Sequence, residues 1–265
     1  MPVHDDLGLR MKEFYEQVPK FRLYRRTPVA IRLDGKAFHT FTRGFEKPFD
    51  EILGEAMRRT MKYLCENIQN TVFGYHQSDE ITLILIDYQT LTTSAWFDYE
   101  IQKVCSIASS MATMAFNKFF ENIVNENYDV GNPYAPKEEK EIVETYLKAI
   151  EKGAMFDARC FNIPKEEVAN LIYWRQLDAT RNSIQMVGQA NFSHKELQHK
   201  SCNDIQDMLM TQKGINWNDF PTHLKRGSCC IRHEEEGGWS IDCNIPIFKG
   251  EDRNYINRCI LYNEN

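Results

Sequence analysis

Two acidic positions carry the residue types and setting that metal-dependent phosphoryl chemistry requires. Asp34 ends an apolar run that begins at Val29, and Gly35 follows it at once and turns the backbone. Asp79 and Glu80 stand at a tight turn that opens a second apolar run. Mg²⁺ takes hard oxygen ligands and prefers one or two carboxylates together with substrate phosphates. The two aspartates therefore predict a site for a magnesium–nucleotide complex.

The residues after Asp34 supply donors for a polyphosphate. The turn from Gly35 to His39 can offer backbone N–H groups, and Lys36 adds a positive charge. Taken alone, an Asp-Gly pair is more often a plain turn, and a Ser-Asp-Glu run is more often a solvated hairpin tip. The prediction therefore depends on whether the surrounding elements bring the two places together.

The elements that must position these residues follow from the residue pattern. Strands are predicted over 28–34, 71–77, 81–86 and 154–161, and helices over 49–67 and 96–120, with a shorter helix over 141–152. The order β-α-β-β-α-β indicates an α+β fold of the split βαβ, ferredoxin-like type, an antiparallel sheet with two helices on one face. In that arrangement the first strand lies beside the central hairpin, so we expect Asp34 and Asp79 to meet at one edge of the sheet.

Beyond Pro164 the pattern changes to a mostly helical extension with a short hairpin. The remaining predicted elements are an N-terminal amphipathic helix over 7–18, helices over 165–190 and 193–212, and two strands over 227–232 and 239–248. We therefore divide the chain into a catalytic domain, residues 1–164, and an extension, residues 165–265. The extension is expected to pack on the catalytic domain and to serve RNA binding or oligomerisation.

Composition limits the alternatives. The chain has 265 residues, of which 42% are hydrophobic and 26% charged, which is typical of a folded globular protein. No signal peptide or membrane-length apolar run is visible, so a cytoplasmic protein without a membrane partner is expected. The net charge of −6 neither indicates nor excludes a nucleic-acid partner. The eight cysteines indicate reduced thiols, and their only cluster with histidine, Cys229, Cys230 and His233, lacks a second ligand pair.

Several motifs together resemble a known family. Arg32-Leu-Asp-Gly-Lys-Ala-Phe-His39 and Tyr75-His-Gln-Ser-Asp-Glu80 resemble the two signature motifs of tRNA(His) guanylyltransferases and their guanylyltransferase-like relatives. Phe156-Asp-Ala-Arg159, Trp174-Arg-Gln-Leu-Asp178 and the opening Leu7–Glu16 are also similar to family segments, in the same order. The resemblance implies a polymerase-palm-like catalytic domain that adds nucleotides in the 3′-to-5′ direction to the 5′ end of tRNA. It also implies a homo-oligomer, commonly a tetramer.

The resemblance further implies residue roles. Asp34 and Asp79 would hold two Mg²⁺ ions, with the Gly35 carbonyl as an added ligand. Glu80 would either take part in the chemistry or form an ion pair at the start of its strand. The implied nucleotide contacts are Lys36, Ala37, Phe38, His39, Ser78 and Lys103. The implied RNA contacts, for which helix packing is an equal alternative, are Arg175, Arg181 and Asn182.

One segment departs from the family pattern. Eukaryotic members carry a His-Ile-Asn-Asn-Leu-Tyr-Asn run, whereas this chain has Thr180-Arg-Asn-Ser-Ile-Gln-Met186. The departure favours the guanylyltransferase-like branch, which resembles a template-dependent repair polymerase that uses ATP to activate the 5′ end and GTP or other nucleoside triphosphates to extend it. The alternatives are non-templated G addition to tRNA(His), a nucleotide cyclase or cyclic-dinucleotide synthase on the same scaffold, and a non-catalytic tRNA-binding module.

Overall fold

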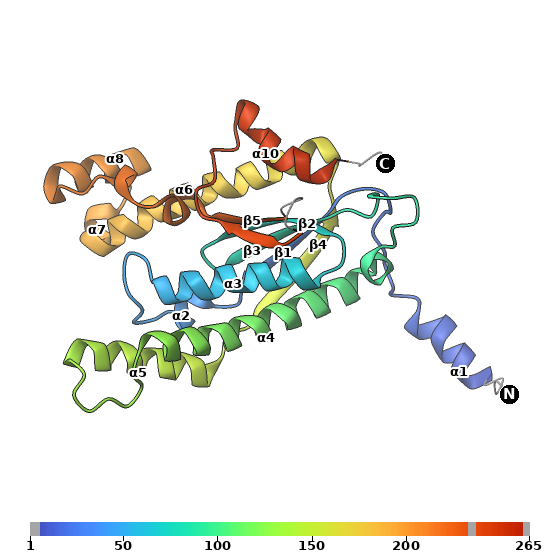
Figure 1. Cartoon of the computed structure of the whole chain (residues 1–265), viewed down its shortest axis with the longest axis horizontal. Helices are drawn as coiled ribbons and strands as arrows, with labels where there is room; N and C mark the ends of the chain where they lie inside the picture. The colour runs from blue at the N-terminus through green and yellow to red at the C-terminus, as the bar shows by residue number, and fades with distance from the viewer. Residues whose placement is uncertain (1–5, 233–236, 262–265) are drawn as a thin grey trace.

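A six-stranded antiparallel sheet organises the chain in the computed structural model, which describes residues 6–232 and 237–261 (Figure 1). The strand order is β4-β1-β3-β2-β5-β6. The strands are β1 (Val29–Gly35), β2 (Thr71–Gln77), β3 (Glu80–Leu85), β4 (Phe156–Asn162), β5 (Ser228–Arg232) and β6 (Trp239–Asp242). Because β3 lies between β1 and β2, the first four strands have the predicted split βαβ order. The C-terminal strands extend the same sheet, since β5 pairs with β2 across the expected boundary at residue 164.

Helices cover both faces of this sheet (Figure 1). The longer ones are α3 (Glu51–Asn67), α4 (Ile101–Asn127), α5 (Lys137–Lys152) and α6 (Val168–Asn191). The shorter ones are α1 (Asp6–Met11), α2 (Phe38–Phe41), α7 (His194–Leu197), α8 (Cys202–Met208), α9 (Thr222–Arg226) and α10 (Asn254–Asn257). Short 3-10 and π-helical turns are η1 (Lys12–Glu16), η2 (Trp96–Tyr99), η3 (Lys165–Glu167), η4 (Leu209–Lys213), η5 (Trp217–Asp219), η6 (Gly250–Arg253) and η7 (Arg258–Ile260).

Alternation along β1 assigns its side chains to two different layers. Val29, Ile31 and Leu33 belong to the apolar core under α3 and α4. Ala30 belongs to the core on the other face, which α6 and the C-terminal segment cover. Because successive strand residues point to opposite faces, Arg32 and Asp34 lie on the α6 face.

Most of the predicted elements are confirmed, and three are wrong in extent. The predicted helix from Trp96 begins only at Ile101 in the structure, because Phe97, Asp98 and Tyr99 have positive φ angles. The predicted helix over 193–212 is interrupted after α7, where the backbone becomes extended. A second capping box, Ser201 with Asp204, then starts α8. The predicted strand over 239–248 ends early, at Asp242.

The N-terminal segment stands apart from the sheet (Figure 1). The predicted helix over 7–18 forms α1 and the π-helical turn η1, and none of their side chains is buried. Apolar side chains remain exposed along it, including Phe14 at 63% and Val18 at 68%. Among the described residues, none of the helices combines the length and apolar character needed to cross a bilayer.

Candidate active site

The end of β1 and the β2–β3 turn meet, as the predicted topology requires. Asp34 stands opposite Glu80 in the sheet register, and the Gly35 N–H donates to the Asp79 carbonyl over 3.1 Å. On the other side, the Lys36 N–H donates to the Met155 carbonyl over 2.9 Å. These bonds fix the backbone after Asp34 between two neighbouring segments, so the two aspartates share one rigid edge of the sheet.

The turn after Asp34 folds back over the core. Ala37 adopts a left-handed conformation with φ 55° and caps α2, whose first N–H groups have no partner within the helix. A Cβ added to Gly35 would lie 2.3 Å from a carbon of the Phe38 ring, so only glycine fits there. The Phe38 ring itself is buried among Phe41, Phe116 and Phe156. Phe38 therefore has only its backbone to offer a ligand, whereas Lys36 and His39 are exposed.

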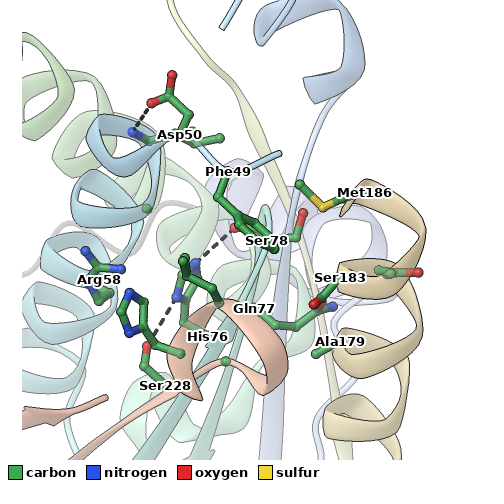
Figure 2. Close-up of a pocket in the computed structure, with 16 residues that line it drawn as sticks. Phe49, Asp50, Arg58, His76, Gln77, Ser78, Ala179, Ser183, Met186 and Ser228 are labelled. Atoms are coloured by element: carbon green, nitrogen blue, oxygen red, sulfur yellow. Dashed lines mark hydrogen bonds between the residues drawn. The ribbon is translucent and has the colours of Figure 1, made fainter. Parts of the chain in front are cut away.

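A buried histidine holds the second turn (Figure 2). His76 Nε2 lies 2.9 Å from the Ser78 carbonyl and His76 Nδ1 lies 3.3 Å from the Ser228 hydroxyl. Since a carbonyl can only accept, Nε2 carries the proton and Nδ1 accepts from Ser228. Burial lowers the pKa of His76 to about 4, so the ring is neutral near pH 7. This bond supports Ser78 at its positive φ of 51°, immediately before Asp79.

Both aspartates carry raised pKa values. For Asp34 the main cause is burial, followed by the negative charge of Asp157, while Arg159 and Arg32 oppose the rise. For Asp79 burial is again the largest cause, and the charge of Asp34 adds to it. The site therefore concentrates partly buried negative charge that the surrounding protein only partly compensates. A bound cation would relieve both effects.

Glu80 forms a buried ion pair, which is one of the two roles expected for it. Its carboxylate accepts from Arg175 Nε over 2.7 Å, and Arg175 also donates to Asp178 over 2.8 Å. Burial raises the pKa of Glu80, although the charge of Arg175 opposes the rise. Arg175 is only 7% exposed and joins α6 to the start of β3. Its guanidinium therefore serves this pair in the structure.

Three further charged residues lie at the site although the residue pattern did not predict a role for them. Arg32, Asp157 and Arg159 share the face of Asp34, because Asp157 stands opposite Asp34 and Arg159 opposite Arg32. Asp157 and Arg159 were noted only as part of a motif. The alternation of β1 and β4 would have placed them, but the pairing of these two strands must be known first.

A pocket adjoins the Ser78 turn (Figure 2). It has an empty volume of about 660 Å³, part of it open to solvent, between the start of α3, the β2–β3 turn, α6 and α9. Phe49, His76, Ser78, Asn182 and Met186 are among its lining residues. A predicted nucleotide contact, Ser78, and a predicted RNA contact, Asn182, therefore border the same cavity.

The remaining predicted contacts lie at different places. Lys103 stands ten residues before Thr113 on α4, about 15 Å along the helix axis. Thr113 accepts from Phe156 N, and Phe156 is opposite Gly35, so Lys103 lies toward the far end of β1 from the aspartates. Its ammonium group lies over the Phe97 ring. Arg181 is exposed on α6 and forms an ion pair with Asp178.

The donor set at the sheet edge fits Mg²⁺. Within the described ranges, no group of three His, Cys, Asp or Glu residues is placed to hold a metal alone. Mg²⁺ does not need one, because it completes its shell with substrate phosphates and water. Asp34 and Asp79 supply the carboxylates. The cysteine–histidine cluster is a poor alternative, since Cys229 and Cys230 belong to cores on opposite faces of the sheet and His233 lies outside the described residues.

Comparison with known proteins places this chain in a family. A family model described as tRNAHis guanylyltransferase matches residues 9–164, which is more than half of the chain. The chain belongs to the tRNA(His) guanylyltransferase family. Members of this family are nucleotidyltransferases.

Relatives of this family member include both characterised and uncharacterised proteins. A tRNA(His) guanylyltransferase of Saccharomyces cerevisiae is 26% identical over 225 residues, which cover 78% of this chain and 83% of the relative. An uncharacterised protein of Acanthamoeba polyphaga mimivirus is 29% identical over 236 residues, covering 85% of this chain and 76% of that protein.

Two solved structures resemble the chain over nearly its whole length. A bacterial tRNA(His) guanylyltransferase (Thg1)-like protein in complex with ATP has a TM-score of 0.82 at 43% identity, covering 97% of this chain and 100% of that one. A bacterial Thg1-like protein in complex with GTP has a TM-score of 0.76 at 38% identity, with the same coverage. Both relatives thus bind a nucleoside triphosphate.

Proposed function

We propose that this chain repairs the 5′ end of tRNA by template-dependent 3′-to-5′ nucleotide addition on a palm-like domain. The observation that carries the proposal is the meeting of Asp34 and Asp79 at one edge of the sheet, beside the start of α2, whose first N–H groups have no partner within the helix. The ATP and GTP complexes of the two bacterial Thg1-like proteins support nucleoside triphosphates as substrates.

In the proposed reaction, the 5′-phosphate of a truncated tRNA is first activated with ATP, or the RNA arrives triphosphorylated. The 3′-hydroxyl of an incoming nucleoside triphosphate, paired with the opposing strand, then attacks the activated phosphate and displaces AMP or pyrophosphate. Asp34, Asp79 and the Gly35 carbonyl would hold two Mg²⁺ ions, which supply charge neutralisation at the phosphates. Lys36 and the backbone N–H groups of residues 37–39 would orient the triphosphate.

The supporting residues have structural tasks in this proposal. The hydrogen bond of His76 to Ser78 keeps the carboxylate of Asp79 at the edge of the sheet. The Glu80–Arg175 pair holds α6 over the same edge. RNA would approach along α6, where Arg181 is exposed and Asn182 borders the pocket.

Extension assays with 5′-truncated tRNAs and each nucleoside triphosphate in turn test the proposal. We expect addition to follow the opposing base, and Asp79→Ala to abolish both activation and addition while tRNA binding persists. Addition of G alone, whatever the opposing base, would instead support non-templated addition to tRNA(His), the activity named for the yeast relative. A product from labelled GTP without RNA would indicate a cyclase. Extension by Asp79→Ala would refute the site.

A further inference from the structure

An exposed tryptophan lies over the active-site face of the sheet. Trp174, on α6, is 52% exposed, and the Arg32 guanidinium carbon lies 5.2 Å from its ring centroid. Arg32 precedes Asp34 by two residues on β1 and therefore shares its face. The next residue of α6, Arg175, pairs with Glu80, which stands opposite Asp34. The ring therefore lies against a residue that is two positions before Asp34 on the same strand.

Two guanidinium groups lie against this ring. Arg175 also lies against the ring, with 4.6 Å between its guanidinium carbon and the centroid. Arg32 forms no ion pair with a carboxylate in the part of the chain that the structure describes, and its Nε is buried without a hydrogen-bond partner. Contacts with two guanidinium groups favour one orientation of the half-exposed indole, so less conformational entropy is lost when a ligand stacks on it.

These features are those of a stacking platform for a nucleobase. An aromatic side chain beside cationic groups binds any base through its π-face, without reading hydrogen-bond donors and acceptors. A polymerase that follows a template must accept every base at the end it extends. Among the four tryptophans, Trp96 and Trp217 are buried and Trp239 is partly buried, which leaves Trp174 as the exposed one.

We propose that Trp174 stacks on the terminal base pair of the tRNA acceptor stem and thereby places the 5′ end beside Asp34. The inference rests on the proposed function, because it assumes that an RNA 5′ end reacts at Asp34 and Asp79. It adds a contact with a base, whereas the predicted RNA contacts Arg175, Arg181 and Asn182 are polar groups.

Steady-state extension of a truncated tRNA by two variants tests the inference. Trp174→Ala should raise KM for the tRNA about 5- to 150-fold, the range for loss of one base–aromatic stack. Trp174→Phe should keep KM within about 3-fold, because a smaller ring still stacks. KM for the nucleoside triphosphate should stay unchanged in both. Leu177→Ala is the matched control, since Leu177 is 50% exposed on the same helix and cannot stack.

Indole fluorescence reports the stack without catalysis. Truncated tRNA should quench the wild-type emission, and the same RNA with abasic residues at the terminal pair should quench it less. In Trp174→Phe the quench should disappear although gel-shift binding persists.

An unchanged tRNA KM in a folded Trp174→Ala, or a quench that persists in Trp174→Phe, would overturn the inference. If Trp174→Ala does not fold, the Phe variant and the abasic RNA decide. If wild type adds only G to tRNA(His), the proposed function fails, while the quench measured with that RNA still tests the stack.

Discussion

At the scale of single residues, the environment of Asp34 and Asp79 disfavours the charge that metal binding requires. Burial raises the pKa of both carboxyls, and the negative charge of Asp157 adds to the rise at Asp34 while that of Asp34 adds to the rise at Asp79. A carboxyl whose pKa is higher in the folded state than in the unfolded state stabilises the fold only at acid pH, and this stability is lost as pH rises through the folded pKa. The metal-free protein therefore carries a destabilising charge cluster at neutral pH.

Asp34→Asn should consequently stabilise the metal-free protein while abolishing activity. We expect a higher Tm than wild type in EDTA at pH 7.5, and a smaller difference at pH 4.5, where the wild-type carboxyl is closer to its neutral form. Added Mg²⁺ should raise the Tm of wild type more than that of the variant. Differential scanning calorimetry measures all three. A lower Tm for Asp34→Asn in EDTA would contradict the electrostatic argument.

His76 should make stability depend on pH in a defined window. Its pKa falls from 6.5 to about 4 on folding, so only the unfolded state binds its proton between these values. The contribution of His76 to the free energy of unfolding is fully present above pH 6.5. It is lost as pH falls toward 4, by up to about 3 kcal/mol. Urea titrations across this range should show a flatter profile for His76→Gln. The exposed His39→Gln is the control and should keep the wild-type slope.

At the scale of elements, the pair Glu80–Arg175 connects α6 to the sheet behind the aspartates. Arg175→Met should cost about 3–5 kcal/mol, because it leaves a buried carboxylate without its partner. Arg181→Met, on the exposed side of the same helix, should change stability by less than about 1 kcal/mol. Urea denaturation measures both.

A double variant isolates the contribution of the Glu80–Arg175 ion pair to stability. Glu80→Gln combined with Arg175→Met should recover much of the lost stability, because no buried charge remains at either position. If the double variant is as unstable as the sum of the two single ones, the ion pair is not the source of the effect.

At the scale of the whole molecule, the N-terminal segment exposes an apolar surface that residues 6–232 and 237–261 do not cover. Phe14, Tyr15 and Val18 are each more than 60% exposed. The homo-oligomer that we propose, expected as a tetramer, would bury such a surface, since large exposed apolar patches mark interaction sites. RNA that crosses from one subunit to another would then meet more than one active site.

Removal of residues 1–18 should therefore lower the mass of the assembly while the core stays folded. Multi-angle light scattering measures the mass, and circular dichroism checks that the Tm changes little. Phe14→Ser should have a partial effect of the same kind. Tyr134→Ser, at a 93% exposed position on a distant loop, is the control. An unchanged mass for the truncated chain would show that this segment does not hold the oligomer.

The sequence by itself determined the order of the elements and the two aspartates. Alternating and helical periods depend on neighbouring residues, so β1, the β2–β3 hairpin and α3 were predicted closely. The split βαβ order then required Asp34 and Asp79 to meet. The boundaries of the elements were less predictable. Positive φ angles at Phe97, Asp98 and Tyr99 delay the start of α4, and the amino-acid composition of this segment does not indicate them.

Only the tertiary structure decided which charged groups surround those aspartates. Arg32, Asp157 and Arg159 come together through the pairing of β1 with β4, strands separated by more than 100 residues. Arg175 could not be told from an RNA contact until its guanidinium was seen on Glu80. Strand pairing and buried ion pairs join residues that are distant in the sequence, and local periodicity does not predict such contacts. Asp34 was therefore predictable from the sequence of its own strand. Its neighbours, including the indole of Trp174, depend on how the sheet and α6 pack.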